Sequence, residues 1–200
     1  EFKKLEDGDK ENLKLWEWFK EESLKEFEKT YESLSVKFDE HKGESFSEPY
    51  LKPLLEEMKK KGITEESEGA LIVKLENLPP ALIQKKDGAS LYLTRDIANL
   101  EYRLKEYSPE KIIYVVGNEQ SLHFEQLFAI AKILGLSAAE LVHVKYGLVL
   151  GETGKKLATR EGRTILGDEV IKKAVDLAYK IVDEKNPDLE VLEKEKISKA

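Results

Sequence analysis

Three segments in the second half of the chain carry residue types that suit one chemical site. They are YLTRDIA at Tyr92–Ala98, YVVGNEQSLHF at Tyr114–Phe124 and GKKLATREGR at Gly154–Arg163. The first two contain predicted strand-to-helix junctions, which is where open α/β sheets bind ligands. The third is a basic segment of a kind that suits a polyphosphate. This combination predicts an enzyme that acts on a nucleotide and on a small cationic or polar substrate.

Asp96 and Tyr92 could present a carboxylate and a phenol at the carboxyl end of a sheet. We expect Asp96 in the first turn of a helix, where free N–H groups favour the charged carboxylate. A carboxylate there would pair well with a guanidinium or ammonium group. Without its neighbours, Asp96 is more simply explained as a helix-stabilising residue and Tyr92 as a core residue.

The second segment adds an amide and an imidazole. Gln120 follows Gly117 at the predicted strand end and could bind a substrate amine or carboxylate, whereas His123 could meet a nucleotide ribose or phosphate. Solvated polar residues at a helix start are the alternative for both. The histidines His41 and His143 have no metal-ligand spacing to His123, and no HxH or HExxH pattern occurs. The sequence therefore predicts no metal site.

The third segment, Gly154–Arg163, contains four cations and two glycines. A basic loop of this kind can close over a triphosphate and stabilise charge that develops in the transition state. A solvated charged turn has the same composition. Neither GxxxxGK[ST] nor GxGxxG occurs in the chain, which argues against a Walker loop and against a nicotinamide-type fingerprint.

Two consecutive βα units must position these segments. Leu91–Leu93 is predicted as a strand, with Thr94 as the cap of the helix that follows it. Ile112–Val116 is an apolar run typical of a buried parallel strand, followed by a helix that ends at Gly135. A last strand is expected at Leu141–Leu150. Two βα units predict a parallel sheet with right-handed crossovers.

Three parts of the chain are expected. Residues 1–89 would form an inserted, helix-rich subdomain with a small β element at Ala70–Leu75, broken by Pro79-Pro80. Residues 90–184 would form the second half of a Rossmann-like catalytic fold. Residues 185–200 would begin a helical linker. The predicted fold class is therefore α/β: the second half of a Rossmann-like parallel-sheet domain with a mainly helical inserted subdomain.

Composition narrows the classes of function. The chain has 200 residues, a hydrophobic fraction of 40% and a net charge of −7, so it suits one domain with a sizeable core, and nucleic-acid contact is restricted to local Lys/Arg clusters. The absence of cysteine excludes disulfides and a cysteine nucleophile and fits a cytoplasmic protein. No apolar run approaches the ~20 residues of a membrane span. Residue 1 is Glu, and we expect further chain upstream.

In their order along the chain, the three segments resemble successive signatures of the class I arginyl-tRNA synthetases. FKKLEDGDKENLKLW at Phe2–Trp16, FDEHKGES at Phe38–Ser45 and EGALIV at Glu68–Val73 also look like that family, so the resemblance covers nearly the whole chain. It implies activation of arginine by ATP and Mg²⁺ to an arginyl-adenylate, then transfer to the 3′ end of arginine tRNA. The HIGH-type ATP signature is expected upstream and an anticodon-binding domain downstream.

The resemblance also assigns residues by position. Tyr92, Asp96 and Gln120 would line the arginine pocket, with Asp96 facing the guanidinium and Tyr92 also able to touch the terminal adenosine of the tRNA. The ATP-binding residues it implies are Gly117, His123, Gly147, Leu148 and Val149. The residues it implies for the KMSKS-type loop are Lys155, Lys156, Thr159 and Arg160.

That loop departs from the family pattern. Leu157 and Ala158 replace the usual Met and Ser, Thr159 stands at the place of a second lysine, and Glu161 stands at a commonly basic position. The alternative interpretation is a non-catalytic arginine- or nucleotide-binding module derived from a synthetase. A helix-rich interaction domain is a third interpretation, based on the charged first 60 residues, and it leaves the three-part site unexplained.

Overall fold

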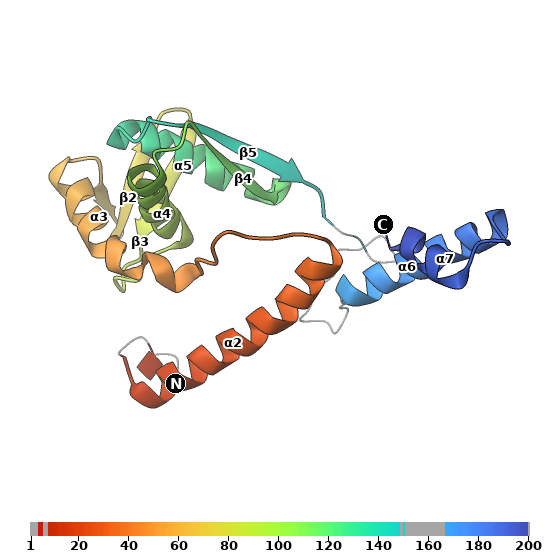
Figure 1. The fold of residues 1–200 in the computed structure, drawn as a ribbon. Helices are drawn as coiled ribbons and strands as arrows, with labels where there is room; N and C mark the ends of the chain where they lie inside the picture. Colours follow the sequence, from red (N-terminus) through yellow and green to blue (C-terminus); the bar gives the residue numbers. More distant parts are fainter. Residues whose placement is uncertain (1–3, 6–7, 149, 151–166, 200) are drawn as a thin grey trace. The chain divides into compact units, whose positions relative to one another are not determined.

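The computed structural model describes residues 4–5, 8–148, 150 and 167–199, which belong to two compact units (Figure 1). One unit combines residues 1–40 with residues 151–200, and the other spans His41–Leu150. In the described part of the chain, no helix is both long enough and apolar enough to cross a membrane.

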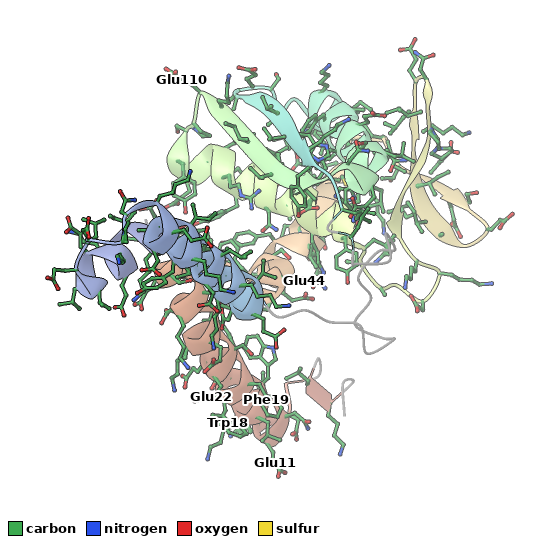
Figure 2. All side chains as sticks on the ribbon, turned by 90° about the vertical axis from the view of Figure 1, so that its right-hand side faces the viewer. Glu11, Trp18, Phe19, Glu22, Glu44 and Glu110 are labelled. Atoms are coloured by element: carbon green, nitrogen blue, oxygen red, sulfur yellow. The ribbon has the colours of Figure 1, made fainter. Side chains whose placement is uncertain are left out.

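The first unit is helical. Its described helices are α2 (Lys10–Ser33), α6 (Gly167–Lys185) and α7 (Val191–Ser198). The Asn12 backbone N–H donates to the Asp9 side chain at 3.0 Å, which caps α2. No described side chain of α2 or α6 is buried. Trp18 and Phe19 are more than half exposed and lie against each other on α2 with ring centroids 5.2 Å apart (Figure 2).

A three-stranded antiparallel sheet and one helix open the second unit. The elements are η1 (Glu44–Ser47), α3 (Glu48–Lys60), β1 (Glu65–Ser67), β2 (Ala70–Leu75) and β3 (Leu78–Gln84), with the strands in the order β1-β2-β3. The strand predicted at Ala70–Leu75 is confirmed. Pro79 and Pro80 do not end the β structure, because β3 is an edge strand and its register with β2 is irregular between Val73 and Leu75. Edge strands and bulges are where proline is tolerated in a sheet.

A parallel βαβ unit completes the second unit and confirms the predicted α/β class. Its elements and the helix before it are α4 (Tyr92–Tyr107), β4 (Lys111–Gly117), η2 (Asn118–Gln120), α5 (Ser121–Leu134) and β5 (Glu140–Tyr146). β4 and β5 pair in parallel from Lys111↔Glu140 to Gly117↔Tyr146. Gly135, with φ +80°, ends α5 as predicted, and β5 ends at Tyr146, before the predicted Leu150.

The prediction of a strand at Leu91–Leu93 is wrong. Leu91 occupies the N-cap position of α4, which starts at Tyr92, and the nearest β pairing is one isolated bridge between Ser90 and Gln84. A short apolar run does not by itself distinguish a strand from the first turn of a buried helix. Thr94 is therefore not a cap: it is fully buried inside α4, and its hydroxyl donates to the Ile83 carbonyl oxygen of β3.

One apolar core holds the start of α4 and the β4–α5 junction in place. Its fully buried large side chains come from α3, β2, β3, α4 and α5: Met58, Val73, Ile83, Ile97, Leu100, Leu127 and Ile130. A hydrogen bond from the Lys61 ammonium to the Leu134 carbonyl, at 3.1 Å, also links the end of α3 to the end of α5. The site described next therefore rests on a packed scaffold.

Candidate active site

Tyr92 and Asp96 lie one turn apart at the start of α4. Tyr92 is the first residue of the helix and its side chain is 69% exposed, so it is not a core residue. Asp96 is the fifth residue, beyond the first turn, which contains no acidic residue. Only the first four N–H groups of a helix lack intrahelical partners. The expectation that Asp96 stabilises the helix through first-turn N–H groups is therefore wrong, and both simpler explanations for this pair lose their support.

The second predicted junction lies at the end of β4. Gly117 is buried at the strand terminus, and Gln120 is exposed as the last residue of η2. The Ser121 hydroxyl donates to the Asn118 carbonyl at 2.6 Å, which fixes the turn from η2 into α5. His123 is the third residue of α5, and its side chain is 21% exposed.

The start of α4 and the β4–α5 junction meet at a contact between Asp96 and His123. His123 Nε2 lies 2.7 Å from Asp96 Oδ2, a hydrogen bond in which the imidazole donates. The His123 ring is also held edge-on to Phe124, at 5.2 Å between ring centroids. Among the described residues, Asp96 Oδ1 has no hydrogen-bond partner. The histidine thus fixes one carboxylate oxygen and leaves the other able to accept from a ligand.

Two glycines mark the carboxyl edge of the parallel sheet. Gly117 is the register partner of Tyr146, and Gly147 directly follows Tyr146. A Cβ on Gly147 would meet no heavy atom of the described chain within 4 Å, so its backbone is open to a flat ligand. Leu148 comes next and is 47% exposed. This edge of the sheet is therefore open and partly apolar.

Glu119 is a site residue that the sequence reasoning missed. A Cβ on Gly117 would lie only 2.5 Å from Glu119 Oε2, so the Glu119 carboxylate folds back over the end of β4. Its position in GNEQ, directly after the strand, was the available signal. Together with Asp96 it places two carboxylates near this edge, where β5 contributes the exposed Lys145. An excess of carboxylates suits a cationic substrate.

Beneath the edge lies a layer of ring side chains that the sequence reasoning also missed. Tyr114 and His143 are register partners on β4 and β5, and Phe124 lies 4.3 Å from His143 between ring centroids. His143 Nε2–H donates to the Val116 carbonyl at 3.0 Å. The Tyr114 hydroxyl is buried without a hydrogen-bond partner among the described residues, and burial raises its pKa, opposed by the nearby Arg103 cation.

Five of the residues assigned from the sequence lie outside the described residues: Val149, Lys155, Lys156, Thr159 and Arg160. The described residues contain no group of three or more His, Cys, Asp or Glu that could hold a metal ion. What the structure brings together is therefore the pair Asp96–His123 and, at the sheet edge, Gly117 with the Tyr146–Gly147 strand end.

The chain matches a family of known proteins along its full length. Residues 1–200 match the family model described as tRNA synthetases class I (R), catalytic domain. The chain is 50% identical over 191 residues to an arginine–tRNA ligase of Exiguobacterium sp., which covers 94% of this chain and 34% of that protein. It is 48% identical over 202 residues to an arginine–tRNA ligase of Ligilactobacillus salivarius, covering 100% of this chain and 35% of that protein. The chain thus spans about a third of the length of these curated relatives.

Solved structures show the same likeness. The arginyl-tRNA synthetase from Plasmodium falciparum is similar with a TM-score of 0.84 and 28% identity, over 98% of this chain and 33% of that one. A putative arginyl-tRNA synthetase from Campylobacter jejuni is similar in fold, with a TM-score of 0.68 and 22% identity, over 86% of this chain and 39% of that one.

Proposed function

Because the chain belongs to the class I tRNA synthetase (R) catalytic-domain family, we propose that it forms part of the catalytic domain of an arginine–tRNA ligase. Such an enzyme joins the carboxylate of arginine to the α-phosphate of ATP, with release of pyrophosphate. It then transfers the arginyl group to the 3′-terminal adenosine of arginine tRNA, with release of AMP. The relatives at 48–50% identity carry that name, which supports the assignment.

The observation that carries this proposal is the Asp96 carboxylate, held at 2.7 Å by His123. A guanidinium group is planar and presents several N–H donors in a fixed fork, whereas an ammonium group is a compact point charge. A pre-oriented carboxylate with a free oxygen therefore selects arginine through charge-assisted hydrogen bonds of about 1.5–3 kcal/mol each. We assign the exposed Tyr92 and Gln120 to the same arginine pocket.

The assignments for ATP follow the open sheet edge. ATP would lie against Gly117, Gly147 and Leu148, with Val149 continuing that segment. His123 uses Nε2 for Asp96, which leaves its Nδ1 for the ribose or a phosphate. Mg²⁺ would accompany ATP and neutralise phosphate charge.

The KMSKS-type loop would supply the cations for the phosphates. We assign this role to Lys155, Lys156 and Arg160, with Thr159 beside them. Catalysis would then consist of positioning and electrostatic stabilisation, without a covalent enzyme intermediate. An acidic described edge makes such a separate source of cations necessary, because carboxylates repel a triphosphate.

The proposed organisation follows from these roles. Residues 1–89 would be an inserted subdomain, residues 90–184 the second half of the catalytic fold, and residues 185–200 the start of a helical linker. We propose a cytoplasmic location, supported by the cysteine-free sequence.

Aminoacylation by the protein expressed from its complete gene tests the proposal. We expect charging of arginine tRNA with radiolabelled arginine and not with lysine. Asp96→Asn should lower kcat/KM for arginine by roughly 100-fold or more, because an uncompensated guanidinium loses about 3 kcal/mol of charge-assisted bonding. Glu106→Gln, an exposed change on the same helix, is the matched control and should have no effect. Normal arginine kinetics in Asp96→Asn would exclude the assigned pocket.

A further inference from the structure

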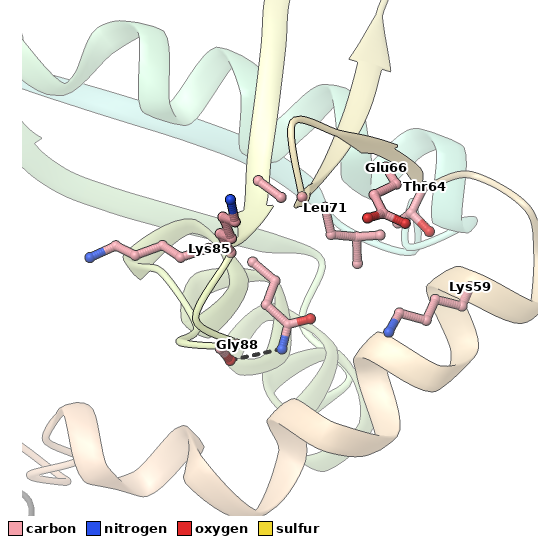
Figure 3. Close-up of a pocket in the computed structure, with 10 residues that line it drawn as sticks. Lys59, Thr64, Glu66, Leu71, Lys85 and Gly88 are labelled. Atoms are coloured by element: carbon pink, nitrogen blue, oxygen red, sulfur yellow. Dashed lines mark hydrogen bonds between the residues drawn. The ribbon is translucent and has the colours of Figure 1, made fainter.

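A basic cavity lies in the second unit, and none of the residues that line it is one assigned to arginine or ATP. It has a volume of about 390 Å³ and is lined by the end of α3, the β1–β2 turn and the turn after β3 (Figure 3). Three of its lining residues are lysines, Lys59, Lys85 and Lys86, and its one acidic residue is Glu66. Cavities of this size are common ligand sites.

The ammonium groups of the three lysines form no ion pair with the described residues. Neighbouring lysines are: Lys61 pairs with Glu57 at 2.8 Å and Lys74 pairs with Glu65 at 2.7 Å. By contrast, no described carboxylate lies within ion-pair distance of Lys59, Lys85 or Lys86, although Glu66 shares the cavity. The cavity therefore concentrates uncompensated positive charge in a chain of net charge −7.

The turn that carries two of these lysines is held by a set of hydrogen bonds. The Lys85 N–H donates to the Ala89 carbonyl at 3.0 Å, and the Ala89 N–H donates to Asp87 Oδ1 at 3.0 Å. Gln84 closes the turn from its side chain, with Nε2 donating to the Gly88 carbonyl at 2.8 Å (Figure 3). The positions of Lys85 and Lys86 are thus built into the turn.

The opposite turn makes room for Lys86. Gly69 has φ +83°, and a Cβ there would lie 3.2 Å from Lys86 Cγ and 3.4 Å from Cε. The stem of Lys86 therefore packs across the β1–β2 turn at a glycine, the residue that readily adopts this φ and leaves this space. Burying the stem while the ammonium stays in water is the usual way in which a lysine is directed to one place.

We propose that this cavity binds a phosphate group of an RNA strand. Lysine ammonium groups bind phosphate as point charges, and three of them around one cavity outweigh the single carboxylate of Glu66. Leu71 and Ala70 provide an apolar side for the attached ribose. The identity of the strand as tRNA rests on the proposed function; the phosphate chemistry rests on the cavity alone.

Filter binding of in vitro transcribed arginine tRNA to the protein from its complete gene tests this inference. Lys59→Ala, Lys85→Ala and Lys86→Ala should each weaken binding by roughly 3- to 10-fold near 0.1 M salt. Because the cavity holds one phosphate, the three changes combined should reduce the slope of log affinity against log salt by about 0.7–0.9 in total. Glu66→Gln should strengthen binding, a change of opposite sign that a general loss of structure would not produce. Lys60→Ala is the matched control, because Lys60 is an exposed lysine of α3 that does not line the cavity.

Three outcomes separate the sources of the phosphate. Weakened tRNA binding in the three lysine variants, with Lys60→Ala unchanged, is the expected result. Unchanged tRNA binding together with weakened binding of inorganic pyrophosphate in calorimetry would overturn the RNA assignment and give the cavity to a free phosphate compound. No change for either ligand would overturn the site altogether. Circular dichroism of each variant checks the fold.

Kinetics distinguish this inference from the proposed function. If the inference holds, the lysine variants raise KM for tRNA and leave KM for arginine unchanged. If wild-type protein charges no tRNA but still binds RNA in a lysine-dependent manner, the proposed function fails and the cavity assignment stands. If charging is normal and KM for tRNA is the same in all variants, the cavity assignment fails and the proposed function stands.

Discussion

Tyr114→Phe should stabilise the parallel βαβ unit, against the usual direction for a change in a core. The side chain is 9% exposed, and its hydroxyl has no hydrogen-bond partner among the described residues. A buried polar group without a partner retains a desolvation penalty of about 1–3 kcal/mol. Phenylalanine keeps the ring contacts with Phe124 and Phe128 and removes that penalty.

The expected gain is about 1 kcal/mol, the lower end of that range. The Arg103 guanidinium carbon lies 5.6 Å from the Tyr114 ring centroid. Both its charge and its N–H groups near the hydroxyl lower the pKa of Tyr114 and recover part of the penalty, although no Arg103 N–H reaches hydrogen-bond geometry with the hydroxyl. Amide hydrogen exchange of β4 measures the effect within the intact protein. A gain of about 1 kcal/mol slows exchange of the most protected amides roughly fivefold. Tyr50→Phe, at a side chain that is 38% exposed, is the control and should change nothing.

The same residue predicts the direction of a pH effect. Burial raises the pKa of Tyr114 above its ordinary value of 10.0. Above that value the unfolded chain binds fewer protons than the folded one, so the stability contributed by Tyr114 falls as pH rises from 10.0 toward the folded pKa. Tyrosinate absorbance should show one late-titrating group that Tyr114→Phe removes. Faster exchange of β4 in Tyr114→Phe would mean that the hydroxyl has a stabilising partner, and the reasoning above would be wrong.

Two further predictions concern helix positions. Thr94→Val removes the hydroxyl that donates to the Ile83 carbonyl in the core, so it should lower the free energy of unfolding by about 1–3 kcal/mol. Hydrogen exchange of the α4 amides measures this loss. An unchanged exchange rate would show that the Ile83 carbonyl has another hydrogen-bond donor. Asp9→Ala should fray the start of α2, since the Asn12 N–H holds the pKa of Asp9 below 3.8. That stabilisation is present above pH 3.8 and lost as pH falls through the lower folded pKa, so exchange of the first turn in wild type and Asp9→Ala should converge in acid.

The parts of the fold that sequence predicts are those in which local pattern and tertiary environment agree. Ile112–Val116 is confirmed as a parallel strand but not as a buried one, because Ile113 and Val115 are 55% and 64% exposed. Gly135 ends α5 as predicted because its φ of +80° favours glycine. Leu91–Leu93 was mispredicted because a three-residue run carries no period. Its outcome depends on Thr94 reaching β3, a contact that only the folded chain contains.

Contacts between residues that are far apart in the sequence were even less predictable than the start of α4. The Lys42 ammonium, before η1, lies within 5.2 Å of the ring centroids of Phe46, Tyr102 and Tyr107. Tyr102 and Tyr107 belong to α4, about 60 residues away in the chain. Because the lysine and two of the three aromatic residues are so far apart in the sequence, no periodicity or motif predicts that they are in contact.

The residue types of the candidate site could be predicted from the sequence, but the contact between Asp96 and His123 could not. The β4–α5 junction identifies where His123 belongs, whereas the strand expected before Asp96 does not exist. The 2.7 Å contact between the two residues joins the side of α4 to the first turn of α5. That contact changes the chemistry, because it converts an ordinary helix carboxylate into an oriented acceptor with one oxygen left for a ligand. The likeness of the folds does not create this acceptor; the side chains at these two positions do.

The net charge of the chain could not show that carboxylates and lysines gather in two different places, near Asp96 and in the basic cavity. A value of −7 argued against broad contact with a polyanion, and the acidic edge at Asp96 and Glu119 agrees with it. The basic cavity nevertheless forms within the same unit, because turns after β1 and β3 bring Lys85 and Lys86 beside Lys59 of α3. Exposed charges interact over about 10 Å at 0.1 M salt, so a ligand responds to such a cluster rather than to the chain average. The proposed arginine–tRNA ligase would hold a cationic amino acid and a polyanionic tRNA, and this local separation of charge suits both.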